Sequence, residues 1–315
     1  MTPDVTIIIP VYNTASYLKA TIASLEALDP RLTYQFICVD DGSTDTSPHM
    51  LAQWAQRDGR VEVYTQRNQG QSVARNAALS HVRGMWTYFL DSDDILMPDA
   101  LVAAHAAATR HGADMVLFSG TIIDEQGQHI DEAEGTIFTH QRYQRPDALP
   151  GDRCIDGVQV MYILLKHYIF RAVPWLYMVR TDFLRNSGIT FHPGIIHEDE
   201  LFTATLTLAC HNVVTLHRTL VLHRIRQSST MGQLFSRRNM DCLLTVIDGV
   251  EQWVTHHPER RRPAWDYCRY TLNHVLITAR SLPLPDRWAA LRRIVGSGYL
   301  PYVEPKRLIL FIYGR

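Results

Sequence analysis

Five short apolar runs recur about every 25 residues in the first 120 residues, with segments of helical periodicity between them. They are Val5–Ile9, Phe36–Val39, Val61–Tyr64, Trp86–Leu90 and Met115–Phe118. The first is rich in β-branched residues, as in a strand that is buried on both faces. Strands that alternate with helices form βαβ units, and right-handed crossovers place the helices on both faces of a parallel sheet. The pattern therefore predicts an α/β fold with a mainly parallel central sheet.

Acidic residues follow two of these strands, at 40–41 and at 91–94. Carboxyl ends of parallel strands meet at one edge of a sheet, where ligands bind in a crevice. Neighbouring carboxylates such as Asp91 and Asp93 repel each other unless a cation lies with them. Their hard oxygen atoms suit Mg²⁺ or Mn²⁺, ions that usually also hold substrate phosphates. We expect a metal and diphosphate site here; the alternative is an acidic turn that caps a helix starting near Pro98.

Composition narrows the class of protein. The chain has 315 residues, enough for one large domain or two smaller ones, and its formal charge of -1 gives no basic field for nucleic acid. Its five cysteines are scattered without a C-x-x-C pair, which argues against a zinc site or a disulfide framework and for a reducing compartment. No signal peptide precedes the first strand, and no run approaches the ~18 apolar residues of a membrane span. We expect a cytoplasmic protein.

The pattern loosens after Gly120. We expect two short strands, Gly120–Asp124 and His129–Ile130, a polar loop over 140–153, a strand at Trp175–Val179, and a helix from about Glu198 to Ala209. A β-rich run at Val213–Leu222 precedes a mainly helical segment from Leu234 onward. This organisation predicts a domain over 1–230, with halves 1–120 and 121–230, and a helical C-terminal region over 231–315.

Four ordered segments carry a family resemblance: Ile7–Asn13, Val39–Asp45, Asn68–Gly70 with Ala74–Asn76, and Leu90–Asp94. Together they resemble the family 2 glycosyltransferases, which are inverting, sugar-nucleotide-dependent enzymes of the GT-A fold. The resemblance is strong over 1–120 and weaker over 198–230. It implies a GT-A, Rossmann-like fold.

The resemblance implies a nucleotide-binding set. Its members are Pro10, Val11, Tyr12, Asn13, Asp40, Asp41, Gly70, Arg75, Asp91, Ser92, Arg226 and Ser229. Asp41 would accept a hydrogen bond from the uracil ring, Arg75 would face the base or the diphosphate, and Gly70 would let the backbone approach the ligand. The alternatives are that the acids at 40–41 are turn formers, that Tyr12 is ordinary packing, and that Arg75 lies on a helix surface.

The resemblance also implies a divalent metal, Mn²⁺ or Mg²⁺, at a D-x-D motif. Asp93 would be the direct ligand, and Asp91 would contact the ribose or a metal-bound water. The metal would neutralise charge on the leaving UDP. Arg226 and Ser229 fit the family's loop over the diphosphate, although His223 stands where an aromatic residue is more common.

A general base must take the proton of the attacking hydroxyl, a contribution worth about 10²–10⁴-fold. Glu198-Asp199 resembles the family's acidic pair, in which the aspartate is the base, so we assign Asp199 and keep Glu198 and Glu200 as competitors. The alternative is that these acids only favour a helix N-terminus. His197 and Trp175 are acceptor-site candidates; Trp175 would stack on a sugar or pack in the core.

The expected function is metal-dependent, inverting transfer of a sugar from a UDP-sugar to a hydroxyl of a glycan or lipid-linked glycan, in envelope polysaccharide or lipopolysaccharide synthesis. A sugar-1-phosphate nucleotidyltransferase would need a Gly-rich basic loop where Pro10–Asn13 stands, and a catalytically silent nucleotide-binding subunit fits poorly with intact Asp91, Asp93 and Asp199. The basic and apolar segment Lys306–Arg315 either contacts the inner membrane surface or docks on the domain. The C-terminal helices are also a surface for homo-oligomer formation.

Overall fold

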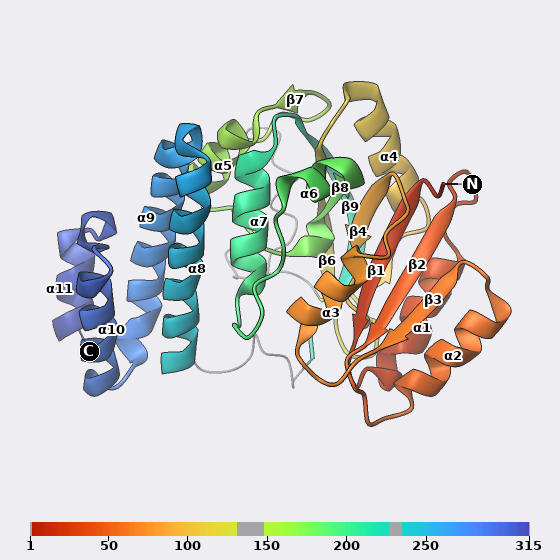
Figure 1. Ribbon diagram of the computed structural model, residues 1–315, viewed down its shortest axis with the longest axis horizontal. Helices are drawn as coiled ribbons and strands as arrows, with labels where there is room; N and C mark the ends of the chain where they lie inside the picture. The colour runs from red at the N-terminus through yellow and green to blue at the C-terminus, as the bar shows by residue number, and fades with distance from the viewer. Residues whose placement is uncertain (1, 131–147, 227–234, 315) are drawn as a thin grey trace.

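The computed structural model describes residues 2–130, 148–226 and 235–314. Figure 1 shows a twisted sheet with flanking helices on one side of the molecule and a stack of C-terminal helices on the other. The α/β part of the chain is thus followed by an all-helical C-terminal part, as the sequence predicts.

The first 123 residues contain strands β1 (Val5–Val11), β2 (Tyr34–Asp40), β3 (Val61–Thr65), β4 (Trp86–Phe89), β5 (Ile95–Leu96) and β6 (Met115–Ile123), with helices α1 (Ala15–Glu26), α2 (Ser47–Arg57), α3 (Gln71–Leu79) and α4 (Ala100–His111). The next part contains β7 (Cys154–Ile155), α5 (Gly157–Lys166), β8 (Tyr177–Arg180), α6 (Thr181–Ser187), α7 (Glu198–Ala209) and β9 (Val213–Arg224). Helices α8 (Arg237–His256), α9 (Arg261–Thr278), α10 (Leu284–Gly296) and α11 (Pro305–Tyr313) complete the described chain.

The strands form one sheet in the order β3-β2-β1-β4-β8-β6-β9-β5, with β7 paired to β9. Strand β1 runs parallel to β2 and β4, β2 runs parallel to β3, and β6 runs parallel to β9. Strand β8 is antiparallel to both of its neighbours, β4 and β6. The predicted α/β fold with a mainly parallel sheet is confirmed, and β8 is the antiparallel insertion that the sequence pattern did not reveal.

Burial explains why the first strands read as continuous apolar runs. All seven residues of β1 and all seven of β2 are buried, because helices cover both faces of a parallel sheet. The same apolar core continues through α7 and α8 to Phe311 in α11. In the part of the chain that the structure describes, no helix combines the length and the hydropathy needed to cross a bilayer.

Two element predictions were wrong in detail. The separate strands expected at 115–118 and 120–124 form one strand, β6, because a bulge around Ser119 keeps the pairing with β9 unbroken. The strand expected from Trp175 begins at Tyr177, since Pro174–Leu176 form a 3₁₀ turn. A side chain on Gly120 would lie 2.8 Å from the Trp175 ring, so the glycine in β6 makes room for this turn. Residues 140–147 of the expected polar loop lie outside the described residues.

Helix α5 holds α7 in position through a close backbone approach. A Cβ atom on Gly157, the first residue of α5, would lie 1.8 Å from the carbonyl oxygen of Thr207 in α7. The Gly157 amide donates to the carbonyl of Cys210 at 3.1 Å. Any larger residue at 157 must push the two helices apart.

We predict that Gly157→Ala lowers the free energy of unfolding by about 1–3 kcal/mol, because the methyl group overpacks the α5–α7 contact. Gly296→Ala is the matched control: nothing lies within 4 Å of its Cβ position in α10, so a change below about 1 kcal/mol is expected. Urea unfolding of the three proteins measures both values. Equal stability of the two variants would contradict the close approach.

Candidate active site

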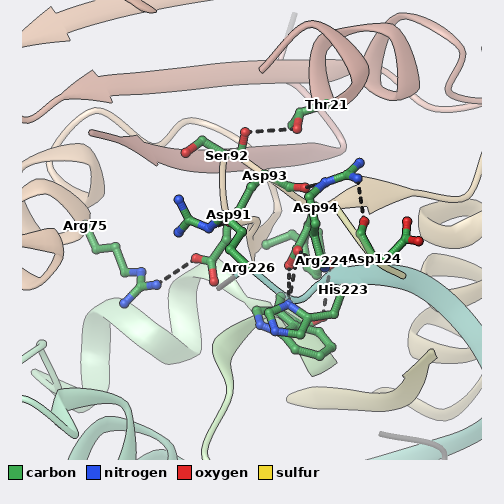
Figure 2. Close-up of polar contacts among 12 residues, drawn as sticks. Thr21, Arg75, Asp91, Ser92, Asp93, Asp94, Asp124, His223, Arg224 and Arg226 are labelled. Carbon is green, nitrogen blue, oxygen red and sulfur yellow. Dashed lines mark hydrogen bonds and ion pairs between the residues drawn. The ribbon is translucent and has the colours of Figure 1, made fainter. Parts of the chain in front are cut away.

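Three carboxylates follow β4, and each contacts a different cationic side chain (Figure 2). The first, Asp91, accepts from Arg75 Nη2 at 2.8 Å. The second, Asp93, lies 2.7 Å from Arg226 Nε through its Oδ2 atom. The third, Asp94, is fully buried and lies 3.0 Å from His223 Nδ1. The predicted clustering of acids at this sheet edge is therefore present, with cations supplied by α3, β9 and the segment after β9.

The residues at 91 and 93 suit a hard divalent cation. Burial and the charges of Asp94 and Asp91 raise the pKa of Asp93 to about 7, against the opposing effect of Arg226 and His223. A carboxylate in this setting gains from a second positive charge. Within the described ranges no group of three or more His, Cys, Asp or Glu side chains converges on one point. The predicted ligands Asp91 and Asp93 would therefore need further oxygen ligands from a substrate or water, and the metal stays a prediction.

His223 and Trp175 form a stacked pair beneath Asp94. Their ring centroids are 4.7 Å apart and their planes differ by 18°. Burial lowers the pKa of His223, but the charge of Asp94 outweighs it and brings this pKa to about 9. His223 is therefore a cation at neutral pH. Trp175 is only 2% exposed, so its predicted acceptor role would require contact at the ring edge or a movement of His223.

The loops at the ends of β2 and β3 meet at Asp41. Its Oδ2 atom accepts from the amide of Gly70 at 2.8 Å, and its Oδ1 atom accepts from the amide of Gln69 at 2.9 Å. Gly70 adopts φ 89°, a left-handed conformation that favours glycine, and open space surrounds its Cβ position. Gln66 Nε2 also donates to Oδ1 at 2.7 Å, so Asp41 shapes this loop, and its hydrogen bond to a uracil ring stays a prediction.

The other predicted nucleotide-binding residues line the same edge. Tyr12 is 49% exposed, so its ring is accessible to a ligand. Asn13 has φ 51°, and its side chain accepts from the amide of Thr44 at 2.8 Å. Asp40 accepts from the amide of Ser43 at 3.1 Å, while Ser92 is buried. Pro10 and Val11 end β1 and are buried.

Arg75 connects two acidic segments of the chain. It is buried in α3, and it bridges Asp91 with Glu198, whose Oε1 atom lies 3.2 Å from Arg75 Nη1. The guanidinium also lies over the Phe191 ring, 5.1 Å from its centroid. The sequence predicted contact with a base or a diphosphate. In the structure this arginine joins the acidic end of β4 to the start of α7, and its contact with a nucleotide stays a prediction.

The three consecutive acids at the start of α7 have different partners. Glu198 is buried and accepts from both Gln71 and Arg75. Glu200 accepts from the hydroxyl of Tyr267 at 2.9 Å. Asp199 is partly exposed, and the contact found for its carboxylate among the described residues is the amide of Glu200 at 3.0 Å. Burial and the charges of Glu198 and Glu200 raise the pKa of Asp199 well above its usual range.

His197 precedes these acids in a left-handed conformation, with φ 69°. Its Nε2 atom lies 3.3 Å from the side-chain amide of Asn239, near the start of α8. Burial lowers the pKa of His197, which keeps the ring neutral. The predicted acceptor residue therefore connects the turn before α7 to the C-terminal helices.

Arg226 follows β9, and its guanidinium lies over the Tyr17 ring at 5.7 Å, close to that of Arg224 at 5.3 Å. Ser229, the other predicted residue of this loop, lies outside the described residues. Sequence reasoning missed Tyr17, Gln71 and Arg224. The sequence did contain one signal, since His223 stands where the family more often has an aromatic residue. A basic side chain at that position is consistent with a carboxylate that needs a cation, and the structure identifies it as Asp94.

Comparison with known proteins places these features in context. The model of the family described as "Glycosyl transferase family 2" matches residues 6–167. The chain is 34% identical to the succinoglycan biosynthesis protein ExoO of Rhizobium meliloti, over 82% of this chain and 73% of that protein. It is 24% identical to the glycosyltransferase GlyG of Streptococcus pneumoniae, over 79% of this chain and 83% of that protein.

Solved structures share the fold. S. aureus TarS 1-349 in complex with UDP-GlcNAc superimposes with a TM-score of 0.64 at 16% identity, over 98% of this chain and 89% of that one. The mannosyltransferase PcManGT from Pyrobaculum calidifontis in complex with GDP-Man and Mn²⁺ gives a TM-score of 0.55 at 15% identity, over 100% and 86% of the two chains. At these identities the likeness concerns the fold.

We predict that Arg75→Gln lowers the free energy of unfolding by about 3–5 kcal/mol, because Asp91 and Glu198 then lose their shared buried cation. Arg83→Gln is the control, since Arg83 pairs with Glu62 on the surface and its loss should cost below about 1 kcal/mol. Denaturant unfolding at one pH compares them. Similar decreases in the free energy of unfolding of both variants would show that the Arg75 bridge stabilises the fold no more than a surface ion pair does.

His223 makes stability depend on pH. A base whose pKa is raised on folding, here from about 6.5 to about 9, stabilises fully below pH 6.5 and loses this contribution as the pH rises through 9. We expect the free energy of unfolding to fall by about 3 kcal/mol over this window. The double variant His223→Phe with Asp94→Asn keeps a ring on Trp175, leaves no unpaired buried charge and should remove the dependence. An unchanged slope in this double variant would exclude the His223–Asp94 pair as its source.

Proposed function

This chain belongs to glycosyl transferase family 2 and is a glycosyltransferase, and we propose that it transfers a sugar from a UDP-sugar to a hydroxyl of a glycan or lipid-linked glycan. One observation carries the proposal. Arg75 joins the acidic end of β4, suited to a metal and a diphosphate, to the start of α7, where Asp199 has a raised pKa. The proposed donor and base residues are thus connected through Arg75, and Figure 1 shows α7 beginning at the edge of the sheet where β1 and β2 end.

The choice of UDP rests on the likeness to TarS, whose structure contains UDP-GlcNAc. It is supported by Asp41 and the exposed ring of Tyr12, which would bind a uracil through a carboxylate acceptor and a stacking face. The structure of PcManGT, which has the same fold, contains GDP-Man. A GDP-sugar is therefore the alternative donor that a test must include.

Asp93, assisted by Asp91, would hold a divalent metal, and PcManGT provides a precedent because its structure contains Mn²⁺. When bound, the metal supplies positive charge to the diphosphate oxygens of the leaving UDP. Arg226 lies on one oxygen of Asp93, and beside a bound diphosphate its guanidinium would balance phosphate charge. His223 lies 3.0 Å from Asp94 and balances the charge of that carboxylate.

The transfer would proceed by a single in-line displacement. The acceptor oxygen forms a bond to the anomeric carbon, and the bond from this carbon to the phosphate oxygen breaks. Asp199 takes the hydroxyl proton, and UDP leaves with the bonding electron pair, so the configuration inverts. The raised pKa of Asp199 makes it a stronger base than an ordinary aspartate.

The biological setting is polysaccharide synthesis, by analogy with ExoO, whose name assigns it to succinoglycan biosynthesis. His197 and Trp175 stay predictions for the acceptor site. The cytoplasmic location likewise stays a prediction; all five cysteines, each in the described part of the chain, are free.

Donor binding tests the proposal directly. Melting temperatures are measured with UDP, GDP, CMP and dTDP, each with and without Mn²⁺. A ligand at 100 times its dissociation constant adds about 2.7 kcal/mol, a shift of a few degrees for a chain of this size. We expect the largest shift with UDP and Mn²⁺ together. A shift with GDP alone would indicate a GDP-sugar donor in place of a UDP-sugar. No shift with any nucleotide would reject the proposal.

Asp199→Asn should lower kcat by about 10²–10⁴-fold while the UDP-induced thermal shift persists, because only the proton acceptor is removed. The wild-type rate should fall as the pH drops through the raised pKa of Asp199, so the acid limb should lie above the usual aspartate range. Asp182→Asn, an exposed acid in the first turn of α6, is the control and should keep full activity. Full activity of Asp199→Asn would show that another residue is the general base.

A further inference from the structure

Exposed apolar side chains gather at the C-terminal end of the molecule. Of the twelve large apolar residues that are exposed in the described ranges, seven lie between 277 and 313. On α10 they form a stripe with Leu284, Trp288 and Val295 on one face, and Trp288 is 50% exposed. The opposite face of α10 is buried through Ala290 and Ile294. This helix is amphipathic, and its apolar surface extends to its outer side.

Helix α11 has the same arrangement. Ile309 and Tyr313 are exposed on the face opposite the buried Phe311, and Tyr313 is 78% exposed. Helix α10 packs on α8, and α11 packs on α9, while α8 and α9 pack together. The outer faces of α10 and α11 therefore point away from the same helix pair, at the end of the molecule farthest from β3 (Figure 1). We call these faces together the C-terminal surface.

The C-terminal surface carries a positive charge. Residues 280–314 contain six basic residues and two acidic ones. Both acids are paired: Asp286 with Arg237 at 3.4 Å, and Glu304 with Arg269 at 3.3 Å. Two of the bases are paired as well: Arg293 with Asp248 at 2.6 Å, and Arg307 with Glu304 at 3.7 Å. Arg292 extends the α10 stripe and Lys306 extends the α11 stripe, and both are exposed. Basic and aromatic side chains thus alternate on one surface.

We propose that the C-terminal surface binds the surface of an anionic membrane. Tryptophan and tyrosine favour the interface between headgroups and acyl chains, and amphipathic helices with exposed basic residues lie in that plane. Each lysine or arginine near such a surface strengthens binding about fivefold. A second copy of the chain fits less well, because two faces of this charge repel each other. The inference goes beyond sugar transfer and does not depend on it.

Vesicle sedimentation tests the proposal with the full chain. We expect binding to vesicles that contain phosphatidylglycerol and phosphatidylcholine, and at least tenfold weaker binding to vesicles of phosphatidylcholine alone. Arg292→Gln and Lys306→Gln should each weaken binding about fivefold. Lys19→Gln, an exposed lysine on α1, is the charge control and should bind as the wild type does.

The apolar contribution is tested with two double variants, Trp288→Ser with Val295→Ser and Ile309→Ser with Tyr313→Ser. Each should weaken binding at least tenfold, while Tyr162→Ser, an exposed tyrosine on α5, should not. An unchanged melting temperature shows that the variants are folded. The proposal is overturned if wild-type protein ignores anionic vesicles or if the double variants bind equally well. It is also overturned if sedimentation velocity shows a dimer that these variants dissociate.

Discussion

The rest of this structure depends on the crowding of three carboxylates at the end of β4. Each is neutralised by a cation from a different place: Arg75 in α3, His223 in β9 and Arg226 just after β9. Uncompensated buried charges cost several kcal/mol each, so these contacts constrain where α3 and β9 lie around the sheet. Charge balance at this sheet edge therefore adds to strand pairing and core packing in joining distant segments of the chain.

Local patterns in the sequence were sufficient for the strands and for the acids that follow them. β1 and β2 are buried on both faces, so their apolar runs are continuous, and the turn residues after them mark the ligand edge. The antiparallel β8 and the unbroken β6 could not be predicted. Both depend on pairing with strands that lie far along the chain, and the bulge at Ser119 has no local signature. The sequence of a short segment thus predicts whether it forms a buried strand, but it does not predict with which strands it pairs.

The candidate site divides in the same way. Sequence located Asp91, Asp93 and Asp199 but left three consecutive acids in competition for one role. Geometry separates them by their partners: Arg75 engages Glu198, and Tyr267 engages Glu200. The contacts that discriminate join residues 67 to 123 positions apart, so no window of sequence contains them. The sequence identified Arg75 as a site residue, but its contact with Glu198 became visible only in the folded structure.

The bridge from Arg75 to Glu198 spans 123 residues, whereas the contacts of Asp41 with Gln69 and Gly70 span 28 and 29. Contacts within a shorter stretch close smaller loops and form earlier, and a chain emerging from the ribosome presents its N-terminal half first. A nascent chain can thus complete the loops around Asp41 before α7 has been synthesised. Glu198 and its neighbour Asp199 join Arg75 only when α7 docks. Under the proposed mechanism, a nascent chain shorter than about 200 residues therefore lacks the base.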